Sequence, residues 1–461
     1  MKVTMKKISK FTFALALAPM SFGLGGTLQA EELKDALAAA YTSNPDLQGQ
    51  RSAQRATDEG MARARAGFLP NVGGSASITR QNVQDENGAT TTEFNSTNKS
   101  YQLRADQSVF RGFRDISSTR EAKSIVKAGR AQLLSVEQDV LLQAVTAYMD
   151  VLRDEAVLKL NANNVDVLKR QLQASQDRFR VGEITRTDVA QSEARLAGAD
   201  SARISAEANL AASRATYRQV IGEVPGSLQK PPALPALPAN FEDALGIAFA
   251  ENPNVAVAKH NEKASRHAVS FAKGSILPTL DAFAYVQRSE GSFGPFAGDR
   301  VTDTKAIGAQ VRVPLYQSGG EYAEIRRTKH INSQRRLQIV AAERRVRADV
   351  RTAWEQYRAS MSSIVSNRSQ VNANEIALDG VRQEAAVGSR TTLDVLDAEQ
   401  ELLDSRVNLV RAERNQYVAG FSLLGALGRL NAVSLDLDVE LYDPKEYYSD
   451  VRWKYLGWGV K

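Results

Sequence analysis

The sequence predicts an α+β membrane protein in which one structural unit occurs twice. Three observations predict this class: the two halves of the chain repeat each other, short segments alternate polar and apolar residues, and very long segments carry a helical period. Of the 461 residues, 43% are hydrophobic and 24% are charged, which is typical of a chain that folds into two or three core-sized units.

Residues 1–30 predict a secretory signal peptide that is removed from the mature protein. Four lysines precede an apolar stretch, and residues 28–30 offer a small residue for cleavage ahead of Glu31. A membrane anchor is the alternative, but Pro19 and several glycines interrupt the apolar stretch. Without residues 1–30 the chain carries 55 basic and 53 acidic residues, a formal charge of +2. This balance indicates no nucleic-acid partner.

The repeat is visible as matching stretches at nearly constant offsets. LKDALAAAYTSNPDL (33–47) matches FEDALGIAFAENPNV (241–255) at an offset of 208 residues. VGEITRTDVAQSEARL (181–196) matches VGSRTTLDVLDAEQEL (387–402) at an offset of 206. Proline cannot continue a helix, so the proline-rich stretch between the copies is a linker. The predicted division is a first repeat at 31–223, the linker at 224–240, a second repeat at 241–430 and a C-terminal segment at 431–461.

Short helices are expected to open each repeat, and a change to a two-residue period follows them. We expect helices at 31–43 and 240–251, each followed after Asn-Pro by a second helix that ends near residue 66 or 274. Alternation of polar and apolar residues then predicts strands. The four expected strands are 71–79, 101–110, 276–287 and 307–315, with polar loops at 81–100 and 288–305.

The rest of each repeat has the period of a helix. Residues 114–180 contain no proline, and 67 residues of helix would be about 100 Å long. Their counterpart is 320–386, and each long helix is expected to return as a second one, at 186–221 and 392–427. Helices of this length need partners along their whole length, which favours coiled-coil packing.

Four strands are too few to close a barrel, for which about eight are needed. After residue 30 no window approaches the ~20 apolar residues of a membrane-spanning helix, so a membrane segment of this chain would be a β-barrel. Because an open sheet edge is not tolerated in lipid, several chains must share one barrel. The helical hairpins would continue from that barrel as a second, hollow cylinder.

No enzymatic activity, metal or cofactor is expected. There are no cysteines, and His260 and His267 stand seven residues apart, further than the i, i+4 spacing of a two-histidine metal pair. A hydrolase that uses paired aspartates is disfavoured because no nucleophile and base accompany them. Active sites also seldom occur as two similar halves of one chain.

The repeated Asn-Pro, the order of elements and the stretch at 387–402 resemble the TolC family of outer-membrane efflux ducts over residues 31–450. The resemblance implies a homotrimer, with a shared 12-stranded β-barrel in outer-membrane lipid and an α-barrel in the periplasm. It also implies that the short helices and the C-terminal segment at 431–461 form a periplasmic belt around the α-barrel. It also implies an exit duct for efflux pumps or type I secretion systems, which a periplasmic adaptor protein connects to an inner-membrane transporter of the RND or ABC type. The cargo is left open, because the pump selects it.

The resemblance assigns roles to the turns between the long helices. Asp394 and Asp397 share one helical face, and three copies would form two carboxylate rings that select cations at the narrowest point. Without the resemblance, the two residues would be a solvated helix face. Arg390, Thr187 and Asp188 would form a latch that keeps this end closed. The family often has a tyrosine five residues before this arginine, where this chain has Ala385, so part of the latch is missing.

The same turns are expected to receive the adaptor protein. Gly182 and Gly388 suit turns that a β-branched residue could not make, and Val181 and Val387 precede them. The alternative is that these glycines only end helices.

Two further alternatives concern the chain as a whole and its C-terminus. A periplasmic coiled-coil scaffold, whose strands pair in water, is the competing function. For the aromatic stretch 442–461, packing on a periplasmic belt is favoured over a place at the membrane interface.

Overall fold

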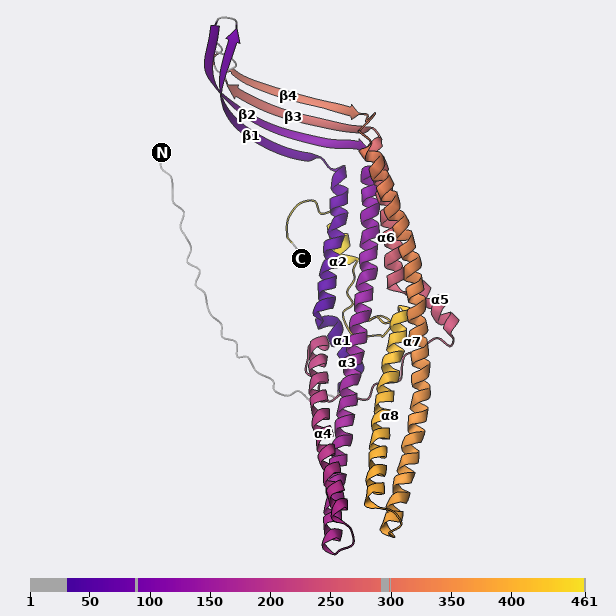
Figure 1. Cartoon of the computed structure of the whole chain (residues 1–461). Coiled ribbons are helices and arrows are strands. Elements are labelled where there is room, and N and C mark those ends of the chain that lie inside the picture. Colours follow the sequence, from indigo (N-terminus) through magenta and orange to yellow (C-terminus); the bar gives the residue numbers. More distant parts are fainter. Residues whose placement is uncertain (1–30, 88–89, 292–297, 299, 460–461) are drawn as a thin grey trace, which may run out of the picture.

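The computed structural model describes residues 31–87, 90–291, 298 and 300–459, so the predicted signal peptide lies outside the described residues. The chain is elongated: a curved sheet lies at one end, across a body of long helices that all run in nearly one direction (Figure 1). This arrangement confirms the predicted α+β class, with one sheet and two long helical hairpins.

Each half of the chain contributes two short helices, one very long helix and one returning helix. The long helices and their returns begin and end at the residues predicted for them, 114–180, 186–221, 320–386 and 392–427. In the first half the helices are α1 (Leu33–Ser43), α2 (Pro45–Arg65), α3 (Arg114–Arg180) and α4 (Arg186–Ile221). In the second half they are α5 (Phe241–Glu251), α6 (Pro253–Lys273), α7 (Gly320–Ala386) and α8 (Thr392–Leu427), and α9 (Glu446–Val451) follows.

The strands form one antiparallel sheet in the order β1-β2-β3-β4. They extend further than predicted, so the expected loops are wrong at 81–87, 90–100, 288–291 and 300–305, whereas 88–89, 292–297 and 299 lie outside the described residues. Polar residues there carry no alternating pattern, but backbone pairing with the partner strand continues through them, as between Gln81 and Ser96. The strands are β1 (Asn71–Asn87), β2 (Thr90–Arg111), β3 (Thr279–Gly291) and β4 (Arg300–Arg312).

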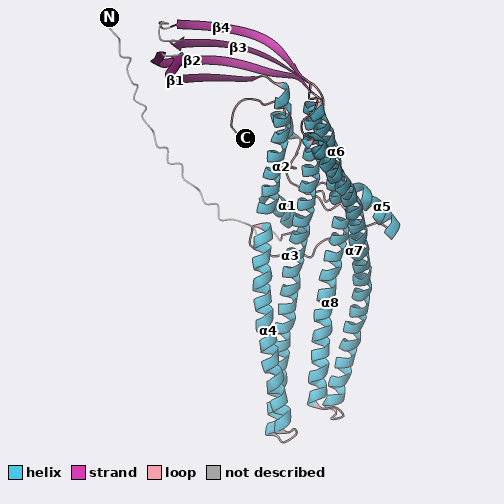
Figure 2. Ribbon diagram, turned by 45° about the horizontal axis from the view of Figure 1, so that its top comes forward, coloured by secondary structure: helices cyan, strands magenta, loops and turns pink. Residues whose placement is uncertain are grey.

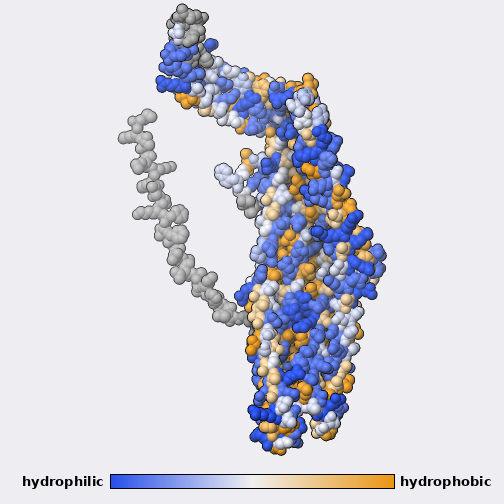
Figure 3. Space-filling model, viewed as in Figure 1, coloured by the Kyte–Doolittle hydropathy of each residue, from blue (hydrophilic) through white to orange (hydrophobic). Residues whose placement is uncertain are grey.

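The register places apolar residues of all four strands on one face of the sheet. Gly74 pairs with Leu103, Leu103 with Val286 and Ala284 with Ile307. These side chains are not covered, since Leu103 is 55% and Ile307 88% exposed. In Figure 3, apolar residues gather where the sheet joins the helices, whereas its far end is hydrophilic.

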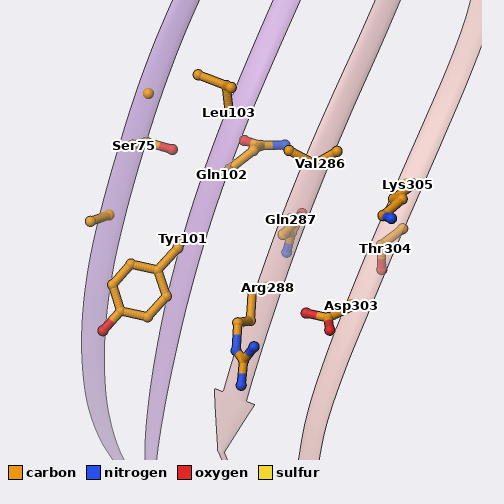
Figure 4. A pocket seen from close by; sticks show the side chains of 12 residues that line it. Ser75, Tyr101, Gln102, Leu103, Val286, Gln287, Arg288, Asp303, Thr304 and Lys305 are labelled. Carbon is orange, nitrogen blue, oxygen red and sulfur yellow. The ribbon is translucent and has the colours of Figure 1, made fainter.

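The curvature of the sheet also forms an open hollow of about 670 Å³ that all four strands line. Ser75, Tyr101, Arg288 and Asp303 are among its lining residues (Figure 4). Tyr101, Arg288 and Asp303 lie beside one another in the register, at the outer rim of the apolar face. The face therefore ends in an aromatic and charged border.

The helices form a curved layer. At two places in this layer two shorter helices are stacked end to end, α2 on α4 and α6 on α8. In the half next to the sheet the order of contacts is α2, α3, α6, α7, and in the other half it is α4, α3, α8, α7 (Figure 2). α2 and α4 thus form one edge of the layer, and α7 alone forms the other. None of the helices among the described residues combines the length and apolar character needed to cross a membrane.

The repeated Asn-Pro motif joins the stacked helices. The Asn44 side chain accepts hydrogen bonds from the backbone N–H groups of Asp46 and Leu47, at 3.0 and 3.3 Å, and so caps α2. Its amide donates to the carbonyl of Val220 in the last turn of α4, at 2.9 Å. Asn252 does the same between α6 and α8, donating to Ala426 at 2.9 Å. One side chain at each junction therefore satisfies the ends of two helices.

The linker and the start of the described chain are anchored to the core around α3. Tyr148 is fully buried, and its single hydroxyl proton is shared between the backbone carbonyls of Glu31 and Gln229, which lie 2.9 and 2.8 Å from the hydroxyl oxygen. Tyr217, also fully buried, hydrogen-bonds the Glu31 carboxylate. These contacts attach the linker and the start of the described chain halfway along α3.

Candidate functional site at the hairpin tips

The two helical hairpins end in turns of the same geometry. Gly182 and Gly388 have φ of +81° and +82°, a conformation that favours glycine. No atom lies within 4 Å of the position that a β-carbon would take at either residue, so backbone conformation and not space requires glycine. The preceding Val181 and Val387 are 76% and 80% exposed. Each tip thus presents an uncovered apolar side chain to solvent.

The returning helices begin with the same capping box. Asp394 accepts hydrogen bonds from the backbone N–H and the hydroxyl of Thr391, at 2.8 and 2.7 Å. Asp188 accepts the same two bonds from Thr185, at 2.8 and 2.7 Å. A threonine three residues before an aspartate is a capping signature that the sequence reasoning missed.

These hydrogen bonds also stabilise the charged form of the two aspartates. The backbone and then the hydroxyl of Thr391 hold the pKa of Asp394 below its ordinary value. The hydroxyl and then the backbone of Thr185 do the same to the pKa of Asp188. Both carboxylates are therefore ionised at neutral pH, and each lies at the positive end of a helix.

Asp397 has a different partner from Asp394. Its carboxylate forms an ion pair with Arg195 of α4, in the other hairpin. Both side chains are partly exposed, so a single pair contributes only about 0–1 kcal/mol. A second pair between the hairpins, Arg414 of α8 with Asp150 of α3 at 2.8 Å, lies further from the tips. Arg195–Asp397 is thus the link nearest to the tips among the ion pairs that join the hairpins in the described residues.

The structure does not bring the predicted latch residues together within the chain. Arg390 pairs with Glu384 of its own turn at 2.8 Å, Asp188 lies in its capping box, and Thr187 is exposed. The other tip has the reversed arrangement, because Arg178 occupies the position of Glu384 and pairs with Glu183 at 2.8 Å. Each turn is closed by its own ion pair, of opposite polarity. Sequence reasoning missed Arg195 because no local pattern connects two different hairpins.

The described residues contain no group of three or more histidines, aspartates or glutamates that could hold a metal ion. The tips carry carboxylates held in capping boxes, two exposed valines and partly exposed ion pairs. Such an arrangement can bind a partner or bias an opening, because exposed ion pairs are individually weak.

Comparison with known proteins adds relatives of nearly full length. The model of the family described as outer membrane efflux protein matches residues 36–223 and again residues 244–429, one match for each repeat. The outer membrane efflux protein BepC of Brucella suis is 35% identical, over 99% of this chain and 98% of its own. The outer membrane protein TolC of Escherichia coli is 28% identical, over 94% of this chain and 88% of its own. Among solved structures, the CmeC outer membrane channel of Campylobacter jejuni superimposes with a TM-score of 0.78 at 14% identity, covering 92% of this chain and 90% of that one.

Proposed function

The chain belongs to the outer membrane efflux protein family, and from this membership we propose that it is the outer-membrane exit duct of an efflux or secretion machinery. The duct conducts passively, from inner-membrane pumps to the outside. The protein resides in the outer membrane, as the description of its family states. It extends into the periplasm, which its long helices support. The family and the fold are those of channel proteins.

The observation that carries this proposal is an uncovered apolar face on a sheet with two free edges. β1 and β4 form the edges, and their outward backbone groups need partners in lipid. Three copies would join β4 of one chain to β1 of the next and close 12 strands. The same rotation would place the edge formed by α2 and α4 against α7 of the next chain, which closes the helical layer as well.

The tips would then surround the axis of the trimer at its periplasmic end. Asp394 and Asp397 from three chains would form carboxylate rings that favour cations. The capping box lowers the pKa of Asp394 and so stabilises its charged form, which supports this role. We propose that Arg195–Asp397 holds the two hairpins of each chain together at this end. A latch of Arg390 with Thr187 and Asp188 would require Arg390 to leave Glu384 in the closed assembly.

We propose the tip turns as the docking site of a periplasmic adaptor protein. Val181-Gly182 and Val387-Gly388 support this because their valines are exposed although large and apolar. The adaptor would join the trimer to an inner-membrane transporter of the RND or ABC type. The alternative of a periplasmic scaffold without a channel is disfavoured by the uncovered apolar face, which water would not stabilise.

Membrane extraction and mass measurement test the duct directly. The mature protein should fractionate with the outer membrane, resist extraction by high salt or urea, and have the mass of three chains in mild detergent. In a strain that lacks its own exit duct, it should restore export when its pump and adaptor are supplied. A soluble periplasmic protein of one chain would contradict the proposal and favour the scaffold.

A further inference from the structure

The chain ends in an exposed aromatic segment, residues 453–459, whose root is firmly held. Trp453, at this root, stacks on Arg65 of α2, with the guanidinium 3.8 Å from the ring centroid. Just before it, Tyr448 lies 5.0 Å from the guanidinium of Arg130 and Tyr447 donates to Glu59 at 2.7 Å. Beyond it, Leu456 is 90% and Trp458 100% exposed. Two large apolar side chains are thus placed in solvent by a fixed base.

This segment projects from one edge of the helical layer. In Figures 1 and 2 it extends beyond α2, on the side opposite to α7, and then turns away from the sheet. α3 and α6 lie between α2 and α7 in the order of contacts across the layer. In a ring of copies, the α2 edge of one chain faces the α7 edge of the next. The segment therefore points at the adjacent chain of the trimer proposed above, on which this inference rests.

α7 presents a surface that suits this segment. Leu337 is 70% and Val340 44% exposed, on the side of α7 away from α6 and α8. Arg326 and Arg344, on the same side, are exposed and form no ion pair within the described part of the chain. Aromatic rings stack favourably on guanidinium groups, and the root of the segment already uses such stacking within its own chain.

The segment and this surface lie at matching heights along the long axis. Three contacts relate the heights of the helices: Gly67 lies beside Asp115, Gly274 lies beside Arg114, and Asn332 donates to Ser265 at 2.9 Å. Counted along these antiparallel helices, Arg65 is level with about residue 325 of α7, and Leu337 lies about 18 Å further from the sheet. A threefold axis parallel to the helices preserves heights. Residues 454–459, if extended, span about 20 Å and reach Leu337.

We propose that residues 453–459 form a clasp that lies on the outward face of α7 of the adjacent copy of this chain. Trp458 covers the apolar side chains of Leu337 and Val340, and the neighbouring arginines of α7 pack against its ring. The clasp links each protomer to the adjacent protomer near the sheet. This is the end of the helices opposite to the tips. The trimer is thereby held together where opening of the tips does not disturb it.

Cysteine cross-linking tests the clasp in the full-length protein in its membrane, because the chain has no cysteine of its own. Trp458→Cys combined with Leu337→Cys should give covalent dimers and trimers on oxidation. Both positions are exposed, so neither substitution disturbs the core. The matched control pairs Trp458→Cys with Ile376→Cys, which is also exposed on α7 but lies about 58 Å further from the sheet. This control should give no cross-link.

Two results would overturn the clasp, and they differ from failure of the duct. Trimers by mass without cross-links at Leu337 would refute the clasp and leave the duct standing. Quenching of fluorescence by brominated phospholipids that is lost in Trp458→Phe would place the segment in the membrane surface instead. Failure to find trimers in the unmodified protein would contradict the proposed function itself.

Discussion

Asn44 makes the junction between α2 and α4 depend on one side-chain amide. Asn44 is 5% exposed, so bulk water cannot take over the hydrogen bonds that its side chain forms. Its oxygen caps α2, and its nitrogen donates to the Val220 carbonyl at the end of α4. Replacement by aspartate keeps the oxygen and exchanges the donor for a second acceptor. Asn44→Asp therefore separates the two functions of the side chain.

The expected magnitudes follow from these two contacts. Asn44→Ala loses the cap, about 1 kcal/mol, and leaves a buried carbonyl without a donor, about 1–3 kcal/mol. The free energy of unfolding per chain should fall by about 2–4 kcal/mol. Asn44→Asp retains the cap, because aspartate caps as well as asparagine does. It still loses the donor and places an anion at the negative end of α4, for a decrease of about 1–4 kcal/mol.

Denaturant unfolding of the purified protein, followed by helical circular dichroism at one fixed protein concentration, measures these changes. Asn374 provides a matched control, since its amide also donates to a backbone carbonyl of another helix, Glu401 at 3.1 Å, but in an exposed place. Asn374→Asp should change stability by no more than about 0.5 kcal/mol. Asn252→Asp should repeat the effect of Asn44→Asp at the second junction.

The reasoning is refuted if Asn44→Asp is as stable as the unmodified protein. That result would mean that Asn44 only caps α2, and that the stacked helices need no amide between them. An equal loss in Asn374→Asp would also contradict it, because burial would then not determine the cost.

Three further predictions concern the backbone, the buried charge and the tips. Gly428→Ala should prevent folding or trimer formation, because φ is +89° and a β-carbon would lie 2.6 Å from the backbone oxygen of Glu251. Gly388 lies in open space at φ +82°, so Gly388→Ala should lower the free energy of unfolding by only about 1–2 kcal/mol. Burial raises the pKa of Asp58 to about 6 from its ordinary value of about 4, so the folded state binds a proton more tightly than the unfolded state. Stability is therefore lost as pH rises from about 4 to 6, and Asp58→Asn should remove this slope in unfolding measured across that range. Arg195→Ser should increase the open probability of single channels, and Asp397→Asn should do the same while lowering cation preference; unchanged gating in both would refute the link between the hairpins.

The helical part of the fold was predictable because its signals are local and long. The stretch 114–180 has a helical period throughout and no proline, and the helix begins and ends at the residues expected. The strands were predicted too short because their outer halves are polar on both faces. Pairing between backbones continues there without any pattern in the side chains, as between Gln81 and Ser96.

The candidate site was predictable in place but not in its contacts. The repeat located both tips and both glycines, and in the structure both glycines have the positive φ that suits such a turn. Thr391 as the partner of Asp394 could have been read from the spacing of a capping box, whereas Arg195 as the partner of Asp397 could not. That pair joins residues about 200 positions apart on separate hairpins, and the packing of α8 against both α3 and α4 brings them together.

Single-channel recording in planar lipid bilayers tests the central claim most directly. The purified protein, added to one side, should produce discrete conductance steps that prefer cations. Asp394→Asn with Asp397→Asn should reduce the cation preference, while Asp188→Asn, which also removes a capping carboxylate, should leave it nearer to that of the unmodified protein. Membranes that stay silent with trimeric, correctly folded protein would contradict the claim that this chain forms a duct.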